Sequence, residues 1–185
     1  KRQATIMANK GKYYESQFEE ATIELLREAH WQYTLGDDIH RKYTDPLIEE
    51  DLRNFLAVQY KDKNLTTSEM DGIVANLRNT GGQNDYYALR NAFLLYRDGY
   101  DFAYSDSRDN PFRMEYIDFE HPDHNIFRCV NQFVMGQGRE NRRPDILLFI
   151  NGIPVCIIEL KNPTKQNATI RDAHTQICTR YMRDI

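Results

Sequence analysis

Residues 144–161 read PDILLFINGIPVCIIELK, and this stretch decides the fold. Two apolar runs flank Asn151-Gly152, a dipeptide that strongly favours a tight turn between antiparallel strands. In the first run, apolar residues occupy successive positions and therefore face both sides of a strand. A strand that is apolar on both faces is usually covered by helices on both sides. The stretch therefore predicts a β-hairpin within an α/β or α+β domain.

Carboxylates stand at the open end of this hairpin. Asp145 opens the first strand, and Glu159 ends the second strand two residues before Lys161. Phosphodiester hydrolysis is very slow without help, and Mg²⁺, which accelerates it, prefers oxygen ligands. Residues two apart on a strand share a face, so the Lys161 ammonium can orient the attacking water and stabilise the developing charge. We expect Asp145, Glu159 and the backbone carbonyl of Leu160 to bind Mg²⁺ beside Lys161.

The register of the hairpin provides a test of this site, because a shared ion requires Asp145 to lie opposite Glu159. A two-residue turn pairs residue 150 with residue 153, which places Asp145 opposite Ile158. A three-residue loop over 151–153 places Asp145 opposite Glu159 instead. We therefore expect a three-residue loop or a bulge with the same effect, and a strict two-residue hairpin counts against the site.

The same residues also allow a simpler interpretation. Glu159 and Lys161 can form a surface ion pair at a strand end, while Asp145 merely opens a strand after Pro144. Such pairs are common and contribute little to stability. Both carboxylates adjoin apolar runs, however, where a charge is costly unless it is paired or bound to a metal. Spacing alone leaves both interpretations open.

The first half of the chain reads as helices. Ser16 with Glu19, and Thr66 with Glu69, form capping boxes that mark helix starts, and Gly99 ends the last helix. The apolar face of the first helix consists of Phe18, Ala21, Thr22, Leu25, Leu26 and Ala29. The four predicted helices cover 16–30, 44–60, 66–79 and 85–97.

Strands follow the helical half. A last helix is expected from Asn167 or Thr169 through Tyr181. We expect one domain over 1–185, mainly helical at 1–98, with a sheet at 99–161 and a closing helix at 167–185. The predicted strands cover 100–104, 113–119, 126–134, 145–150 and 154–161.

The amino-acid composition limits the classes of protein to which the chain can belong. Hydrophobic residues make up 41% and charged residues 28% of 185, which excludes a disordered chain and suits one domain. The longest apolar stretch, Ile146 to Ile150, is too short to cross a membrane. The three cysteines have no zinc-ligand spacing, so we expect reduced thiols in the cytoplasm. The net charge is −4, but residues 139–185 carry eight Lys/Arg against five Asp/Glu, which is compatible with a DNA-facing side.

The hairpin also lies within a longer recognisable pattern. It includes Asp118-Phe119, Asn131-Gln132-Phe133, and the continuous stretches 142–154 and 158–163, RRPDILLFINGIP and IELKNP. The pattern resembles the amino-terminal nuclease domain of the restriction (R) subunit of type I restriction-modification enzymes, densely over 119–185 and loosely over 19–31.

The resemblance implies a PD-(D/E)xK restriction-endonuclease-like fold with a central mixed sheet flanked by helices. It implies that Asp145 and Glu159 bind Mg²⁺ and that Lys161 assists the water. It further implies that Glu19 is an acidic residue near the metal. A capping role explains Glu19 equally well, and both roles can hold.

The family also has a Gln-x-x-x-Tyr motif on the helix that follows the lysine, which is implied to position DNA or the active site, and Gln176 is the site residue expected from it. Gln176 precedes Tyr181 by five residues instead of four, which on an α-helix turns the tyrosine by about 100°. Gln176 then shares a face with Arg180, and Tyr181 is either a DNA contact or a core residue. Arg142 and Arg143 are candidates for phosphate contacts, although a solvated strand entry also accounts for them.

The resemblance implies partners beyond this chain. The chain, which lacks an initial Met, is expected to be part of a longer subunit with an ATP-driven translocase. No Gly-Lys-Ser/Thr phosphate loop occurs in these residues, so ATP is expected only in the parent. The implied activity is non-specific cleavage of double-stranded DNA after translocation, in a complex with specificity and methyltransferase subunits. The alternatives are another PD-(D/E)xK nuclease, in repair or mobile-element defence, and a catalytically silent module that docks methyltransferase subunits.

Overall fold

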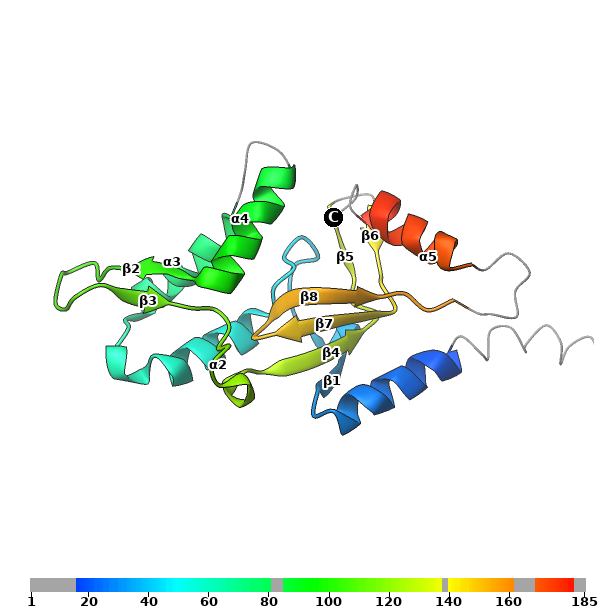
Figure 1. Cartoon of the computed structure of the whole chain (residues 1–185), viewed down its shortest axis with the longest axis horizontal. Helices are drawn as coiled ribbons and strands as arrows, with labels where there is room; N and C mark the ends of the chain where they lie inside the picture. The colour runs from blue at the N-terminus through cyan, green and yellow to red at the C-terminus, as the bar shows by residue number, and fades with distance from the viewer. Residues whose placement is uncertain (1–15, 81–84, 138–139, 162–168, 182–185) are drawn as a thin grey trace, which may run out of the picture. The chain divides into compact units, whose positions relative to one another are not determined.

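A computed structural model describes residues 16–80, 85–137, 140–161 and 169–181. These residues form two compact units. The sheet unit comprises the described residues of Lys1–Pro46, Phe127–Phe149 and Ile153–Ile185. The helical unit comprises the described residues of Leu47–Ile126 and Ile150–Gly152. Figure 1 labels the elements of both.

The sheet unit contains a mixed four-stranded sheet in the order β1-β4-β7-β8. Strands β1 and β4 are parallel, with Gln32 opposite Arg128 and Leu35 opposite Asn131. Strands β7 and β8 follow one another through a tight turn and are therefore antiparallel. The sheet strands are β1 (Gln32–Leu35), β4 (Phe127–Asn131), β7 (Ile146–Ile150) and β8 (Ile153–Ile158), and the antiparallel ribbon beside them is β5 (Met135–Gln137) with β6 (Glu140–Arg142).

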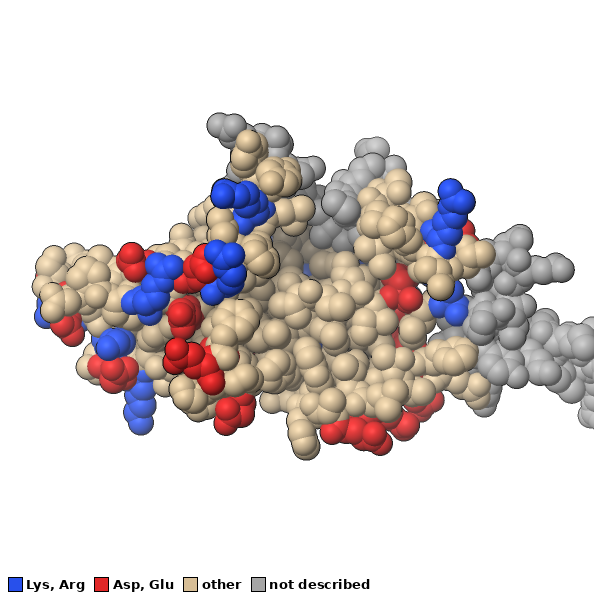
Figure 2. Space-filling view, in the orientation of Figure 1, with Lys and Arg blue, Asp and Glu red and all other residues tan. Residues whose placement is uncertain are grey.

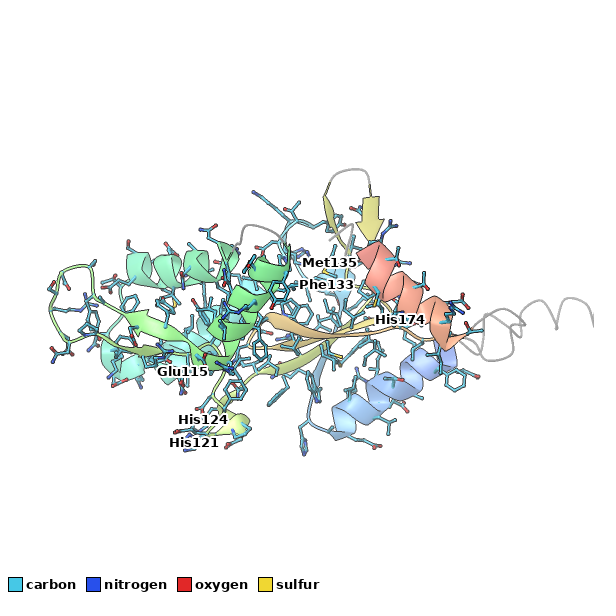
Figure 3. All side chains as sticks on the ribbon, turned by 45° about the horizontal axis from the view of Figure 1, so that its top comes forward. Glu115, His121, His124, Phe133, Met135 and His174 are labelled. Atoms are coloured by element: carbon cyan, nitrogen blue, oxygen red, sulfur yellow. The ribbon has the colours of Figure 1, made fainter. Side chains whose placement is uncertain are left out.

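Helices lie on both sides of this sheet, as predicted. The first helix, over residues 16–28, packs Ile23 against Cys129 and Ile146. Helix α5 (Ile170–Thr175) and the π-helical turn η4 (Gln176–Tyr181) lie on the opposite side in the views of Figures 1 and 3. The prediction of a mixed α/β domain is confirmed. None of the helices in the described ranges combines the length and apolar character that crossing a membrane needs.

The buried face of the first helix differs from the prediction. Phe18 is 45% exposed and Leu25 is 65% exposed, whereas Ile23 is buried and Leu26 is partly buried. Glu19, Ile23 and Leu26 share one side of the helix at spacings of four and three residues. That side packs because Glu19 accepts hydrogen bonds from β4 and the residue after it, which fixes how the helix is rotated.

The helical unit confirms two of the predicted helix boundaries. Thr66 and Glu69 form the expected capping box at the start of α3. Gly99, with a φ of 63°, ends α4 and donates its N–H to the carbonyl of Leu95 at 2.9 Å. The elements of this unit are α2 (Glu49–Gln59), α3 (Thr67–Arg78) and α4 (Asp85–Asp98), the ribbon β2 (Tyr100–Phe102) with β3 (Phe112–Met114), and 3-10 turns that include η3 (Pro122–His124).

Helix α2 begins later than predicted. It begins at Glu49 instead of near Thr44. The two residues before it, Leu47 and Ile48, are buried, and the backbone N–H of Ile48 forms a hydrogen bond outside the helix. The N–H of Ile48 donates to the carbonyl of Gly152 at 2.9 Å, so this segment is tied to the turn of the β7–β8 hairpin. The short strands β1, β5 and β6 were not predicted.

The hairpin turn has two residues, so the prediction of a three-residue loop was wrong. Asn151 and Gly152 both have positive φ, 51° and 74°, as a type I′ turn requires. A Cβ at Gly152 would lie 2.1 Å from the carbonyl oxygen of Ile48, so no larger residue fits there.

Strand β8 nevertheless departs from strict alternation. Pairing of residue 150 with residue 153 would place Ile146 on the same face as Ile157, yet Ile158 packs with Ile146 in one apolar cluster. Val155 and Cys156, at successive positions, are both exposed. A bulge in β8 that sets Asp145 opposite Glu159 stays a prediction.

Candidate active site

Asp145 lies immediately before β7 and is held from two sides. Its carboxylate oxygen Oδ2 accepts the backbone N–H of Leu160 at 2.7 Å. Its own carbonyl accepts the backbone N–H of Gln132 at 3.2 Å. The bond from Leu160 brings the segment Glu159-Leu160-Lys161 beside Asp145, at the end of the hairpin where the sequence predicted it.

Glu159 is the most enclosed carboxylate of this group, with a side chain only 1% exposed. Its Oε2 accepts hydrogen bonds from Lys161 Nζ at 3.2 Å and from Gln176 Nε2 at 2.9 Å. The Glu159–Lys161 pair therefore forms, but its burial differs from that of a solvated surface pair. Gln176, predicted as a site residue, joins the group through Glu159.

The charge on Asp145 is held in an unfavourable environment. Burial raises its pKa to about 6, while the N–H from Leu160 lowers it. The negative charge of Glu159 raises this pKa further, Lys161 lowers it, and Glu19 raises it. All three side chains are thus close enough to act on Asp145 electrostatically. A bound cation would relieve a carboxylate in this position, because it favours the ionised form.

Glu19 reaches the group from the first helix. Its Oε1 accepts hydrogen bonds from Asn131 Nδ2 at 3.0 Å and from Gln132 Nε2 at 3.1 Å. Asn131 in turn accepts the hydroxyl of Tyr33 at 3.0 Å. These residues line a pocket of about 430 Å³ that also includes Arg27. Glu19 is therefore positioned by β4 and the residue that follows it.

Gln132 is a residue of the site to which the sequence assigned no role. It has a φ of 57°, a left-handed conformation that is uncommon for a residue other than glycine and often occurs at functional sites. Its backbone N–H donates a hydrogen bond to the carbonyl of Asp145, and its side-chain amide donates one to the carboxylate of Glu19. Gly36 allows the Gln132 backbone to approach closely, because a Cβ there would lie 2.5 Å from the carbonyl oxygen of Gln132.

The helix that follows Lys161 is not α-helical throughout. Gln176–Tyr181 is π-helical, and a π-helix joins residues five apart through its backbone hydrogen bonds. The expectation that Gln176 shares a face with Arg180 assumed an α-helix. The side chains of Arg180 and Tyr181, like Asn167, lie outside what the structure describes.

The donors near Asp145 fit a hard divalent cation. Asp145 and Glu159 offer carboxylate oxygens, the ligands that Mg²⁺ prefers, and the Leu160 carbonyl stays a predicted third ligand. Arg142 ends β6 and is partly buried, and Arg143 follows it and is exposed. Their contacts with phosphate also stay a prediction.

Acidic side chains gather on one exposed side of the first helix, at the lower edge of Figure 2. Glu20, Glu24 and Glu28 are exposed at spacings of four residues. This face carries a local excess of negative charge, which repels anions such as phosphate.

Comparisons with known proteins identify relatives of the chain. Residues 12–185 match the family described as the type I restriction enzyme R protein N terminus. The chain is 29% identical over 175 residues to the type I restriction enzyme HindI endonuclease subunit of Haemophilus influenzae, covering 89% of this chain and 16% of that protein. It is 30% identical over 175 residues to the putative type I restriction enzyme MjaIXP endonuclease subunit of Methanocaldococcus jannaschii, covering 90% and 17%. The chain thus spans about a sixth of these relatives. No solved structure matches it at a significant level.

Proposed function

Because the chain belongs to the family of type I restriction enzyme R-protein N termini, we propose that it is the Mg²⁺-dependent endonuclease domain of such a subunit. The observation that carries this proposal is the meeting of Asp145 with Glu159-Leu160-Lys161 through the 2.7 Å bond from the Leu160 N–H. The proposed fold type is PD-(D/E)xK, which the mixed sheet and its active-site hairpin support.

In this proposal, Asp145, Glu159 and the Leu160 carbonyl hold Mg²⁺. When bound, the ion would supply Lewis acidity toward the phosphate. Lys161 orients the attacking water and stabilises the charge that develops on the phosphate. Gln176 fixes the carboxylate of Glu159 through its 2.9 Å bond. Glu19, held by Asn131 and Gln132, adds a further negative charge near Asp145.

The substrate is proposed to be double-stranded DNA, cut without sequence preference after ATP-driven translocation by the parent subunit. The excess of Lys and Arg over residues 139–185 supports a phosphate contact in this part of the chain, with Arg142, Arg143 and Tyr181 as candidates.

Specificity and methyltransferase subunits are the proposed protein partners, in the cytoplasm. Another nuclease with the same fold remains the alternative, and a phosphate loop downstream in the parent protein distinguishes the two.

The direct test is calorimetric titration of Mg²⁺ or Mn²⁺ into the wild-type chain, Asp145→Ala and Glu159→Ala. We expect binding that both substitutions abolish. Glu28→Ala is the matched control, because it removes an exposed carboxylate from the first helix. Binding that survives both active-site substitutions contradicts the assignment.

A second test uses the complete restriction complex. Asp145→Ala in the full-length subunit is expected to abolish DNA cleavage in the presence of ATP while translocation continues. A catalytically silent docking module predicts unchanged cleavage and no divalent-ion binding. Loss of both cleavage and translocation would point to a folding defect and calls for the milder Asp145→Asn.

A further inference from the structure

A second group of metal-ligating side chains lies in the helical unit, at Asp118, His121 and His124. The three residues are spaced by three. His121 immediately precedes the 3-10 turn η3, and His124 is its last residue. Side chains three apart eclipse one another in a 3-10 turn. The two imidazoles accordingly stack with their ring centroids 4.9 Å apart and their planes inclined by 17°. Figure 3 labels the two histidines beside each other.

Both rings direct a nitrogen toward the same carboxylate. His121 Nδ1 lies 3.6 Å from Asp118 Oδ1, and His124 Nδ1 lies 3.1 Å from Asp118 Oδ2. One ligand atom from each of the three side chains lies within 4.8 Å of the others. With metal–ligand bonds of about 2.0–2.2 Å, neighbouring ligand atoms in a tetrahedral zinc site are about 3.3 Å apart. The two nitrogen–oxygen distances to Asp118, 3.1 Å and 3.6 Å, lie on either side of that value.

We propose that Asp118, His121 and His124 form a binding site for one borderline divalent ion such as Zn²⁺. Two imidazole nitrogens and one carboxylate favour Zn²⁺, Ni²⁺ or Cu²⁺, whereas Mg²⁺ prefers oxygen ligands. The site is therefore chemically different from the carboxylate group around Asp145. Water completes the coordination, since the histidine side chains are 60% and 51% exposed.

The carboxylate that anchors this site is fixed in place. The Asp118 side chain is only 5% exposed. Its Oδ1 accepts the backbone N–H of Glu120 at 3.1 Å and that of His121 at 2.8 Å, and its Oδ2 accepts Gln59 Nε2 at 3.0 Å. A rigid acidic anchor with two accessible imidazoles lowers the cost of ordering the ligands when an ion binds.

The same geometry can also be satisfied by protons. Each imidazole can donate its Nδ1–H to Asp118, and an ion would replace these protons. Binding of a transition ion near neutral pH distinguishes the two cases, because a turn held together by hydrogen bonds alone has no open position for a metal.

The loop that carries this site also supports the hairpin turn. Asn125 donates its side-chain amide to the carbonyl of Asp118 at 2.7 Å, and its Oδ1 accepts Asn151 Nδ2 at 2.8 Å. Asn151 is the first turn residue between β7 and β8. An ion at Asp118, His121 and His124 therefore braces the loop that holds this turn, and we expect it to raise the thermal midpoint of the chain.

The test is calorimetric titration of Zn²⁺ into the wild-type chain, His121→Asn, His124→Asn and the double variant. Both histidines are exposed, so the variants are expected to fold, which circular dichroism checks. His40→Asn is the control for a histidine outside the site, and His174→Asn controls for the pair that His174 forms with Cys178 Sγ at 3.4 Å. Asp145→Ala controls for Zn²⁺ at the carboxylate group.

We expect one saturable Zn²⁺ site in the wild-type chain. It is lost in the double variant, weakened in each single variant, and retained in the three controls. The visible spectrum of bound Co²⁺, recorded for the same set, should change only in the three variants that replace His121, His124 or both. The proposal is overturned if the wild-type chain has no saturable site, if the site survives in the double variant, or if His174→Asn or Asp145→Ala abolishes it.

Discussion

Asp145→Asn should make the metal-free chain more stable near neutral pH. The fold holds the pKa of Asp145 at about 6 instead of 3.8, with burial as the main cause. At about 1.4 kcal/mol per pKa unit, the ionised carboxylate costs the fold about 3 kcal/mol. Asparagine has nearly the same shape without the charge. Its weaker bond to the Leu160 N–H offsets about 1 kcal/mol, so the expected net gain is about 2 kcal/mol.

The direction of the pKa shift determines the pH range over which the stability difference between the two proteins develops. Because the folded pKa lies above the unfolded pKa, the native state binds the proton more tightly, and the charge penalty develops as pH rises from about 4 to about 6. Above that window the variant should be more stable by a constant amount. Below it Asp145 is protonated in both states, and the two proteins should unfold alike.

The assay is urea unfolding in EDTA at about pH 7.5 and about pH 4, with Asp38→Asn as the control for an exposed carboxylate. Adding Mg²⁺ at the higher pH should stabilise the wild type and leave Asp145→Asn unchanged. A variant that is less stable at pH 7.5, or equally more stable at both pH values, would refute the reasoning. Either result would mean that the charge of Asp145 is well compensated in the fold.

Three further substitutions test other parts of the structure. Gly36→Ala should destabilise the chain by about 1–3 kcal/mol in urea unfolding through its clash with the Gln132 carbonyl, whereas Gly72→Ala, with open space around it, should not. Glu69→Gln should lower the thermal midpoint at neutral pH, because Arg108 holds the pKa of Glu69 below its ordinary value, and the difference should shrink as acid protonates Glu69. Gln176→Ala should weaken Mg²⁺ binding about tenfold in calorimetry, whereas exposed Gln17→Ala should leave it unchanged.

Local signals predicted the parts of the fold that depend on neighbouring residues. The capping box of Thr66 and Glu69 and the end of α4 at Gly99 are set within one helical turn. The turn at Asn151-Gly152 is likewise a local preference for positive φ. Asp145, Glu159 and Lys161 could be selected for the same reason, since they flank one hairpin.

Long-range contacts decided what the sequence did not reveal. The start of α2 depends on a bond between Ile48 and Gly152. The rotation of the first helix depends on how Glu19 meets β4, more than a hundred residues later. Strand β1 has four residues and forms against β4. No local pattern marks Gln132 as a connection between Glu19 and Asp145.

The π-helical turn Gln176–Tyr181 has a consequence for how such domains diverge. One residue added to an α-helix rotates everything after it by about 100°, which would disrupt each later contact of that helix. A wider turn absorbs the extra residue locally, so the segment downstream keeps its phase. An insertion next to a glutamine that contacts a predicted metal ligand can therefore be tolerated in evolution. A search that demands fixed spacing between motif residues will overlook family members that have accepted one.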